Sequence, residues 1–159
     1  MADFSGTPEG QHRRCAVVAS RFNQPIVERL VDGALDALVR HGVAADNVDV
    51  IWVPGAWELP VAARRLLASE RYDAVIAVGA VIRGDTPHFD FVAGEASRGL
   101  ASASVEFDTP IGFGVLTCDT VDQADARAGG DHGNKGWDAA LAALEMADLF
   151  DRLDAANES

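Results

Sequence analysis

The chain has 159 residues, a length that fits one domain with a substantial hydrophobic core. Its 48% hydrophobic and 24% charged residues are ordinary globular values. Thirteen basic against 25 acidic residues give a net charge of −12, which argues against a nucleic-acid partner and against an anionic membrane surface. An anionic substrate would therefore have to be held by local groups, against the overall field.

Two cysteines, Cys15 and Cys118, lie far apart in apolar runs, without the spacing of metal ligands. They are expected to be reduced, buried side chains of a cytoplasmic protein. We find no signal-peptide pattern and no apolar run of membrane-spanning length, so no membrane association is expected.

The first half of the chain alternates strand and helix patterns. Polar residues with Gly and Pro fill positions 1–12 and predict a flexible N-terminal arm ahead of a single domain over 13–159. The domain is expected to begin with a strand over 15–19 and a helix over 25–41, which Asn23 can cap and Gly42 ends. A second strand over 48–53 and a helix from 56 or 57 to 69 should follow.

The third strand is expected over 74–82, where β-branched residues without alternation are typical of a strand buried on both faces of a parallel sheet. After it, Gly84 supplies a turn, Asp85 or Thr86 can cap a helix, and Pro87 suits the first helical position. A helix N-terminus beside a strand's carboxyl end gathers free N–H groups and partial positive charge, which is a site for an anion.

The remaining elements complete the pattern. A helix follows from His88, then a strand over 111–118, a short helix over 121–128, a loop over 129–133 and a last helix over 136–153. Strands alternating with helices predict a three-layer α/β/α sandwich around a four-stranded parallel sheet.

In such a fold the carboxyl ends of the strands gather at one edge. This edge would collect residues 20–23, 54–58, 83–88 and the segment from Thr117 onward. The aromatic rings of Phe22 and Trp57 could stack on a flat heterocycle, and Glu58 could accept hydrogen bonds from it. The composition of the edge predicts a site for a planar ring together with a phosphate.

Each of these residues also has a purely structural interpretation. Phe22 and Trp57 could be core anchors, and Glu58 could simply complement a helix dipole. Arg127 stands at a helix end, where a cation is favourable anyway, and Lys135, the only lysine, could be a solvated charge. Taken singly, no residue decides between the two interpretations.

Four segments together resemble the lumazine synthase family. They are Pro54-Gly-Ala-Trp-Glu-Leu-Pro60, Gly79-Ala-Val-Ile-Arg-Gly-Asp-Thr-Pro-His-Phe-Asp90, Gly112-Phe-Gly-Val-Leu-Thr117 and Asn134-Lys-Gly136. The resemblance spans nearly the whole chain and implies a flavodoxin-like fold. The departures are mild, since Trp57 stands where the family usually has phenylalanine, Asp85 often alternates with glutamate, and Phe91 with tyrosine.

The resemblance implies a transferase of riboflavin biosynthesis with two small-molecule substrates and no cofactor or metal. It would condense 5-amino-6-(D-ribitylamino)uracil with 3,4-dihydroxy-2-butanone 4-phosphate to 6,7-dimethyl-8-ribityllumazine, releasing phosphate and water. His88 would be the catalytic proton carrier. The residues implied to bind the pyrimidine are Phe22, Ala56, Trp57, Glu58, Ala80, Val81, Ile82 and Phe113, and those for the phosphorylated ketone are Asp85, Thr86, Arg127 and Lys135.

The resemblance also implies a homo-oligomer. Family members form pentamers, and some pack these into an icosahedral shell of sixty subunits. Phe113 would enter the site from an adjacent subunit, and the short loop over 129–133 is associated with the shell form. The helix that starts at His88 is rich in small residues, which suits close packing between subunits.

Two other hypotheses stay open. Lys135 could act as the nucleophile of a Schiff-base aldolase on a phosphorylated ketone, which borohydride would trap on the protein. Alternatively, the chain could be a non-catalytic carrier of a flavin or lumazine, which would show no turnover with the two substrates.

Overall fold

A parallel sheet of four strands forms the centre of the computed structural model, which describes residues 1–158. The strands are β1 (Cys15–Ser20), β2 (Val48–Val53), β3 (Ala74–Ile82) and β4 (Ile111–Cys118), in the order β2-β1-β3-β4. Strand β3 pairs on one side with β1 and on the other with β4, and all its residues except the last are buried. This confirms the strand pattern expected from the sequence.

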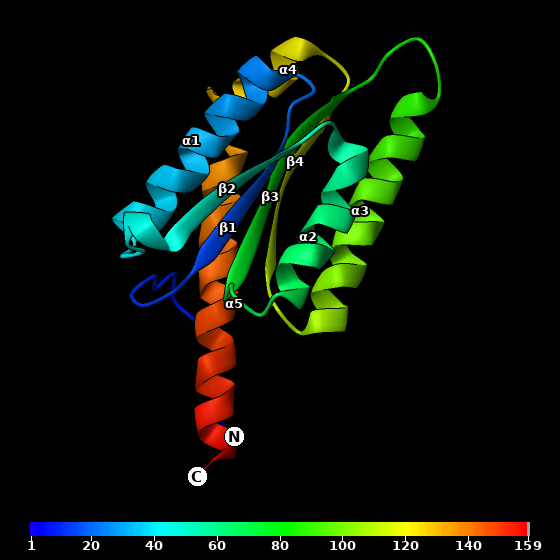
Figure 1. Cartoon of the computed structure of the whole chain (residues 1–159). Coiled ribbons are helices and arrows are strands. Elements are labelled where there is room, and N and C mark those ends of the chain that lie inside the picture. The colour runs from blue at the N-terminus through cyan, green and yellow to red at the C-terminus, as the bar shows by residue number, and fades with distance from the viewer. Residues whose placement is uncertain (159) are drawn as a thin grey trace.

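Helices cover both faces of the sheet, as predicted (Figure 1). Helices α1 (Gln24–Arg40) and α5 (Lys135–Asn157) lie on one face, and α2 (Leu59–Ala68) and α3 (His88–Phe107) lie on the other. Alternate residues of the central strands point to opposite faces, so each face has its own core. The core beneath α1 and α5 includes Val17 and Ile76, and the opposite core includes Val18 and Val75.

Several element boundaries differ from the predictions. Residues Ala56–Glu58 form a short 3₁₀ helix, η2, so α2 itself begins only at Leu59. Another short 3₁₀ helix, η1 (Ala45–Asn47), precedes β2. Helix α4 (Val121–Ala126) ends two residues early because the chain turns into a small antiparallel hairpin of β5 (Ala128–Gly130) and β6 (Gly133–Asn134). The hairpin replaces the loop expected over 129–133.

The side-chain cap expected at α1 was wrong. Asn23 occupies the N-cap position of α1, but its backbone is left-handed, with φ of 61°, and its side chain makes no cap hydrogen bond. Its Nδ2 instead donates to the carbonyl of Ala80 at 2.9 Å. At α3 the N-cap position is Pro87, and Thr86, the residue before it, accepts a hydrogen bond through Oγ1 from the backbone N–H of His88 at 3.4 Å.

Helix α5 is fixed against α1 by a cap and a close approach. The Oδ1 atom of Asn134 accepts hydrogen bonds from the backbone N–H groups of Gly136 and Trp137, at 2.9 and 3.1 Å. Its Nδ2 donates to the carbonyl of Arg29 in α1 at 2.9 Å. A Cβ on Gly136 would lie 2.0 Å from the carbonyl oxygen of Leu30, so only glycine fits there.

The N-terminal segment lies along α5. The backbone N–H of Thr7 donates to Asp148 at 2.9 Å, and Arg13 pairs with Asp151 at 2.8 Å. The Thr7 N–H, followed by Arg152, holds the pKa of the Asp148 carboxyl below its ordinary value. The flexibility predicted for residues 1–12, and the division of the chain at 12 and 13, stay predictions.

Burial keeps the two cysteine thiols protonated. Cys15 and Cys118 are free and buried in the structure. Desolvation raises the pKa of Cys15 to about 12 and also raises the pKa of Cys118. Neither side chain is therefore a thiolate near neutral pH.

Among the helices of residues 1–158, none combines the length and apolar character needed to cross a bilayer.

Candidate active site

Three loops meet at the carboxyl edge of the sheet, where they are joined by hydrogen bonds. The backbone N–H of Arg21 donates to the carbonyl of Val53 at 2.8 Å, and that of Phe22 donates to the carbonyl of Pro54 at 3.1 Å. The Asn23 side chain reaches Ala80 in β3, as described above. These bonds set the loops after β1, β2 and β3 side by side, as the parallel topology predicts.

The loops enclose a cavity of about 750 Å³, which we call the apolar pocket. Its volume lies in the range of sites for small molecules. It is lined by Phe22, Gly55, Ala56, Trp57, Glu58, Ala80, Val81, Ile82, Gly84, Thr86, His88, Phe89, Phe91 and Val92. Nine of these residues were predicted from the sequence: Phe22, Ala56, Trp57, Glu58, Ala80, Val81, Ile82, Thr86 and His88.

The exposed fractions of the aromatic side chains indicate whether they pack in the core or are free to bind a ligand. Phe22 is 71% exposed and Trp57 is 57% exposed, so neither anchors the core of this chain. Phe91, with 67% exposure, is a third open ring. Open aromatic faces beside a pocket are suited to stacking on a flat ring. Three other lining residues, Ala56, Ala80 and Val81, are in contrast buried.

The anion loop, residues 84–87, borders this pocket at the start of α3. The backbone N–H of His88 donates to Thr86 Oγ1 at 3.4 Å, and both residues line the pocket with exposed side chains. Asp85 is exposed in the same loop but does not line the pocket. Free N–H groups at the start of the 20-residue α3 give this side of the pocket a positive potential.

A second depression, of about 560 Å³, holds three of the four remaining predicted residues, all but Asp85, and we call it the arginine pocket. Phe113, Arg127 and Lys135 line it, together with Cys118, Gln123, His132 and Asp138. The Arg127 side chain donates through Nη1 to the carbonyl of Gln123 at 3.0 Å, and the Lys135 backbone N–H donates to the Arg127 carbonyl at 2.9 Å. The hairpin after α4 therefore sets both cations at one place.

One chain thus separates the predicted residues into two groups. The apolar pocket contains the open rings and His88 but none of the predicted cations, whereas the arginine pocket contains Arg127 and Lys135. Arg127 and Lys135 were expected beside the phosphate subsite, and a single chain does not bring them to the apolar pocket, whereas Phe113 was expected to come from an adjacent subunit. Phe113 is 41% exposed at the end of the sheet, on edge strand β4. A surface of that kind can be covered by another copy of the chain.

Five lining residues of the apolar pocket were not among the predicted site residues. Gly55 and Gly84 lie within the edge segments expected from the sequence, and the other three were not expected at the site. Phe89, Phe91 and Val92 come from the first turns of α3 and line the pocket beside His88. The helical spacing of Phe89 and Val92 was visible in the sequence, but it indicated only core packing. Within residues 1–158 we find no group of three or more His, Cys, Asp or Glu side chains placed to hold a metal ion.

Comparisons with known proteins show which family this sequence resembles. A family model described as 6,7-dimethyl-8-ribityllumazine synthase matches residues 12–151. A protein of that name from Gemmatimonas aurantiaca (strain DSM 14586 / JCM 11422 / NBRC 100505 / T-27) is 68% identical over 158 residues, which cover 99% of this chain and 96% of the relative. Another, from Aquifex aeolicus (strain VF5), is 54% identical over 153 residues, covering 96% of this chain and 99% of the relative.

Proposed function

Because the chain belongs to the 6,7-dimethyl-8-ribityllumazine synthase family, we propose that it catalyses the condensation this name describes. The substrates are 5-amino-6-(D-ribitylamino)uracil and 3,4-dihydroxy-2-butanone 4-phosphate, and the products are the lumazine, inorganic phosphate and water. The observation that carries the proposal is the apolar pocket, in which open aromatic rings lie beside a helix N-terminus and a histidine.

The pyrimidine is assigned to the apolar pocket. Its flat ring stacks on the exposed face of Phe22, and Glu58 accepts hydrogen bonds from its polar edge and ribityl chain. Ala56 and Trp57 line the wall, and the backbone of Ala80, Val81 and Ile82 forms the floor. Buried floor residues and open rings together match a ligand that is flat on one side and polar at its edge.

The chemistry needs little from the protein beyond orientation and proton transfer. The amine of the pyrimidine attacks the ketone and forms a Schiff base with loss of one water. Phosphate then leaves by elimination, and the resulting enol tautomerises to a new ketone. The second nitrogen attacks this ketone and closes the ring with loss of a second water. Since the substrate carries its own nucleophile, holding the two reactants together supplies much of the acceleration. His88, exposed at the pocket wall, takes and returns protons in these steps.

The phosphate is assigned to the start of α3 together with cations of a second subunit. Asp85 and Thr86 offer backbone N–H groups, and Arg127 and Lys135 of a neighbouring copy supply the positive charge. Phe113 enters with them, because it lines the same arginine pocket. The separation of the two pockets within one chain supports a site shared between subunits of a homo-oligomer, and the assembly we propose is a pentamer.

Turnover of the two authentic substrates is the direct test. Formation of the lumazine is followed by its absorbance, and light scattering gives the assembly size in the same sample. Lumazine formation by an oligomer supports the proposal, whereas binding of the pyrimidine without turnover would support a carrier. Substrate trapped on the protein by borohydride would instead support an aldolase using Lys135.

The proposed location is the cytoplasm, where free thiols such as Cys15 and Cys118 stay reduced.

A further inference from the structure

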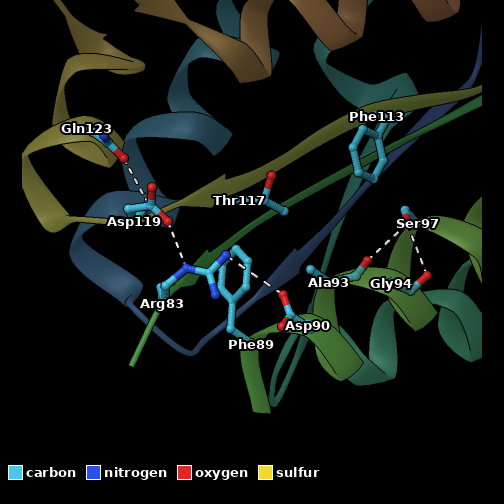
Figure 2. A pocket seen from close by; sticks show the side chains of 10 residues that line it. All are labelled: Arg83, Phe89, Asp90, Ala93, Gly94, Ser97, Phe113, Thr117, Asp119 and Gln123. Carbon is cyan, nitrogen blue, oxygen red and sulfur yellow. Dashed lines mark hydrogen bonds and ion pairs between the residues drawn. The ribbon is translucent and has the colours of Figure 1, made fainter. Parts of the chain in front are cut away.

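Arg83 is the first residue after β3 and directly precedes the anion loop, a position from which its charge could reach a phosphate. In the structure its side chain points toward Asp119 and Asp90 (Figure 2). Arg83 does not line the apolar pocket. It borders a separate depression of about 600 Å³, which also includes Phe89, Asp90 and Asp119. The identity of the phosphate ligand rests here on the proposed function.

Four contacts hold Arg83 in this position. Its Nε donates to Asp119 Oδ1 at 2.8 Å, and its Nη2 lies 3.8 Å from Asp90 Oδ1. Its guanidinium carbon lies 4.5 Å from the centre of the Phe89 ring, within the range of a cation–π contact. Its backbone N–H donates to the carbonyl of Cys118 at 2.9 Å. Figure 2 shows the guanidinium between the Asp119 carboxylate and Asp90, over the ring of Phe89.

The partner Asp119 is itself fixed to the next element. Its backbone N–H donates to Gln123 Oε1 at 2.8 Å, and Gln123 forms a capping box with Thr120 at the start of α4. Asp90 and Phe89, in contrast, belong to the first turn of α3. Arg83 therefore bridges two elements: the junction of β4 with α4, and the turn of α3 that carries His88.

The anion loop has little other support. Within residues 1–158, no heavy atom apart from those of Gly84 and its chain neighbours lies within 4 Å of where a Cβ on Gly84 would stand. The hydrogen bonds that the structure gives residues 84–87 stay local, from the His88 N–H to Thr86 Oγ1 and from the Asp90 N–H to the Pro87 carbonyl. The loop is therefore positioned by its two ends, and Arg83 contacts the fixed groups at both.

We propose that Arg83 is a positioning residue, which clamps the anion loop between Asp119 and the first turn of α3 and makes no contact with the phosphate itself. Its effect on phosphate binding passes through the backbone N–H groups of the loop. Asp119 is then part of the same device. This assignment predicts that removing the aspartate and removing the arginine have the same consequence.

Three variants separate the clamp from a direct phosphate ligand: Arg83→Ala, Asp119→Asn and the double variant. Exposed ion pairs are individually weak, and both Arg83 and Asp119 are about half exposed or more. Losing the clamp should therefore weaken inhibition by inorganic phosphate and raise the KM for the phosphorylated ketone by about fivefold, the upper range for such a contact. Both single variants should show this loss, and the double variant should show no more than either.

A matched control is available elsewhere on the chain. Arg64 pairs with Glu106 at 2.8 and 3.1 Å, and its guanidinium lies 5.4 Å from the centre of the Phe107 ring, but these contacts join α2 to the far end of α3. Arg64→Ala removes the same kinds of interaction and should leave the ketone KM unchanged. In all four variants the KM for the pyrimidine should stay at the wild-type value. Hydrogen exchange of the 84–88 amides should be faster only in the Arg83 and Asp119 variants.

The outcomes that overturn the clamp are distinct. If Asp119→Asn keeps or improves phosphate affinity while Arg83→Ala weakens it, Arg83 binds the phosphate directly, because freeing it from the aspartate then helps. Equal losses in Arg64→Ala would mean general destabilisation, and unchanged affinity and exchange in the Arg83 and Asp119 variants would mean that the loop is held otherwise. Absence of lumazine formation by the wild-type chain would refute the proposed function alone, because hydrogen exchange of the 84–88 amides measures the effect of the clamp without turnover.

Discussion

Two impaired variants of this chain should restore activity to each other when they assemble together, provided that their lesions lie in different pockets. Phe22→Ala damages the apolar pocket, and Arg127→Ala damages the arginine pocket. Neither change should harm the fold. Phe22 is 71% exposed, and the hydrogen bond that the Arg127 side chain donates, at 3.0 Å, is local because it goes to the Gln123 carbonyl one helical turn away. A guanidinium has five N–H donors, so Arg127 keeps donors that can meet a phosphate.

The size of the effect follows from the interactions that each substitution removes and from the geometry of a shared site. Removal of a charge-assisted hydrogen bond at Arg127 costs about 1.5–3 kcal/mol, which is roughly a ten- to hundredfold weaker affinity for the ketone. Removal of the Phe22 ring eliminates a stacking interaction worth about 0.5–1.5 kcal/mol beyond its buried area. When the two variants mix at random in equal amounts, about one quarter of the interfaces combine two undamaged pockets.

The assay uses co-expression of the two variants with different affinity tags and purification through both tags in turn. Lumazine formation by the doubly tagged assembly, measured at limiting ketone, should reach about one quarter of the wild-type rate. A mixture of Phe22→Ala with Trp57→Ala is the control, because both lesions lie in the apolar pocket and no interface is restored. Co-purification with a rate equal to the average of the two parents would place the complete site within one chain and refute the shared site.

Three further predictions concern single residues. His88→Ala should slow turnover by about 10²–10⁴-fold at saturating substrates without abolishing it, and a pH–rate profile equal to the wild type would remove His88 from the mechanism. Gly136→Ala should lower the free energy of unfolding by about 1–3 kcal/mol in a urea titration, since a methyl would collide with an α1 carbonyl, and an unchanged midpoint would contradict this contact. The lowered pKa of Asp148 means that its charged form stabilises the N-terminal segment above the ordinary carboxyl pKa and loses that effect as the pH falls through the lowered value. Asp148→Asn should therefore speed hydrogen exchange of the Thr7 amide at neutral pH, and equal protection in both proteins would refute the contact.

The sequence alone was sufficient for the fold and for nine of the residues that line the apolar pocket. The unalternated apolar run of β3 indicated a strand buried on both faces, and turn signals after it located the start of α3 at His88. These are local patterns, since burial on both faces, helical spacing and turn residues leave their mark within a few neighbouring positions. Parallel topology then brings the loops after β1, β2 and β3 to one edge, which is why Phe22, Trp57 and His88 were predicted together.

Only the tertiary structure decided where the polar side chains of the loops point. Asn23 was expected to cap α1, but its amide reaches Ala80, 57 residues away. Arg83 turns to Asp119 across 36 residues, and Arg127 and Lys135 lie in a pocket apart from the anion loop. The physical reason is that a long polar side chain has several partners within reach, and the one it meets depends on strand order and packing. Periodicity in the sequence records which face of an element is buried, and it carries no information about which distant group stands beside a loop.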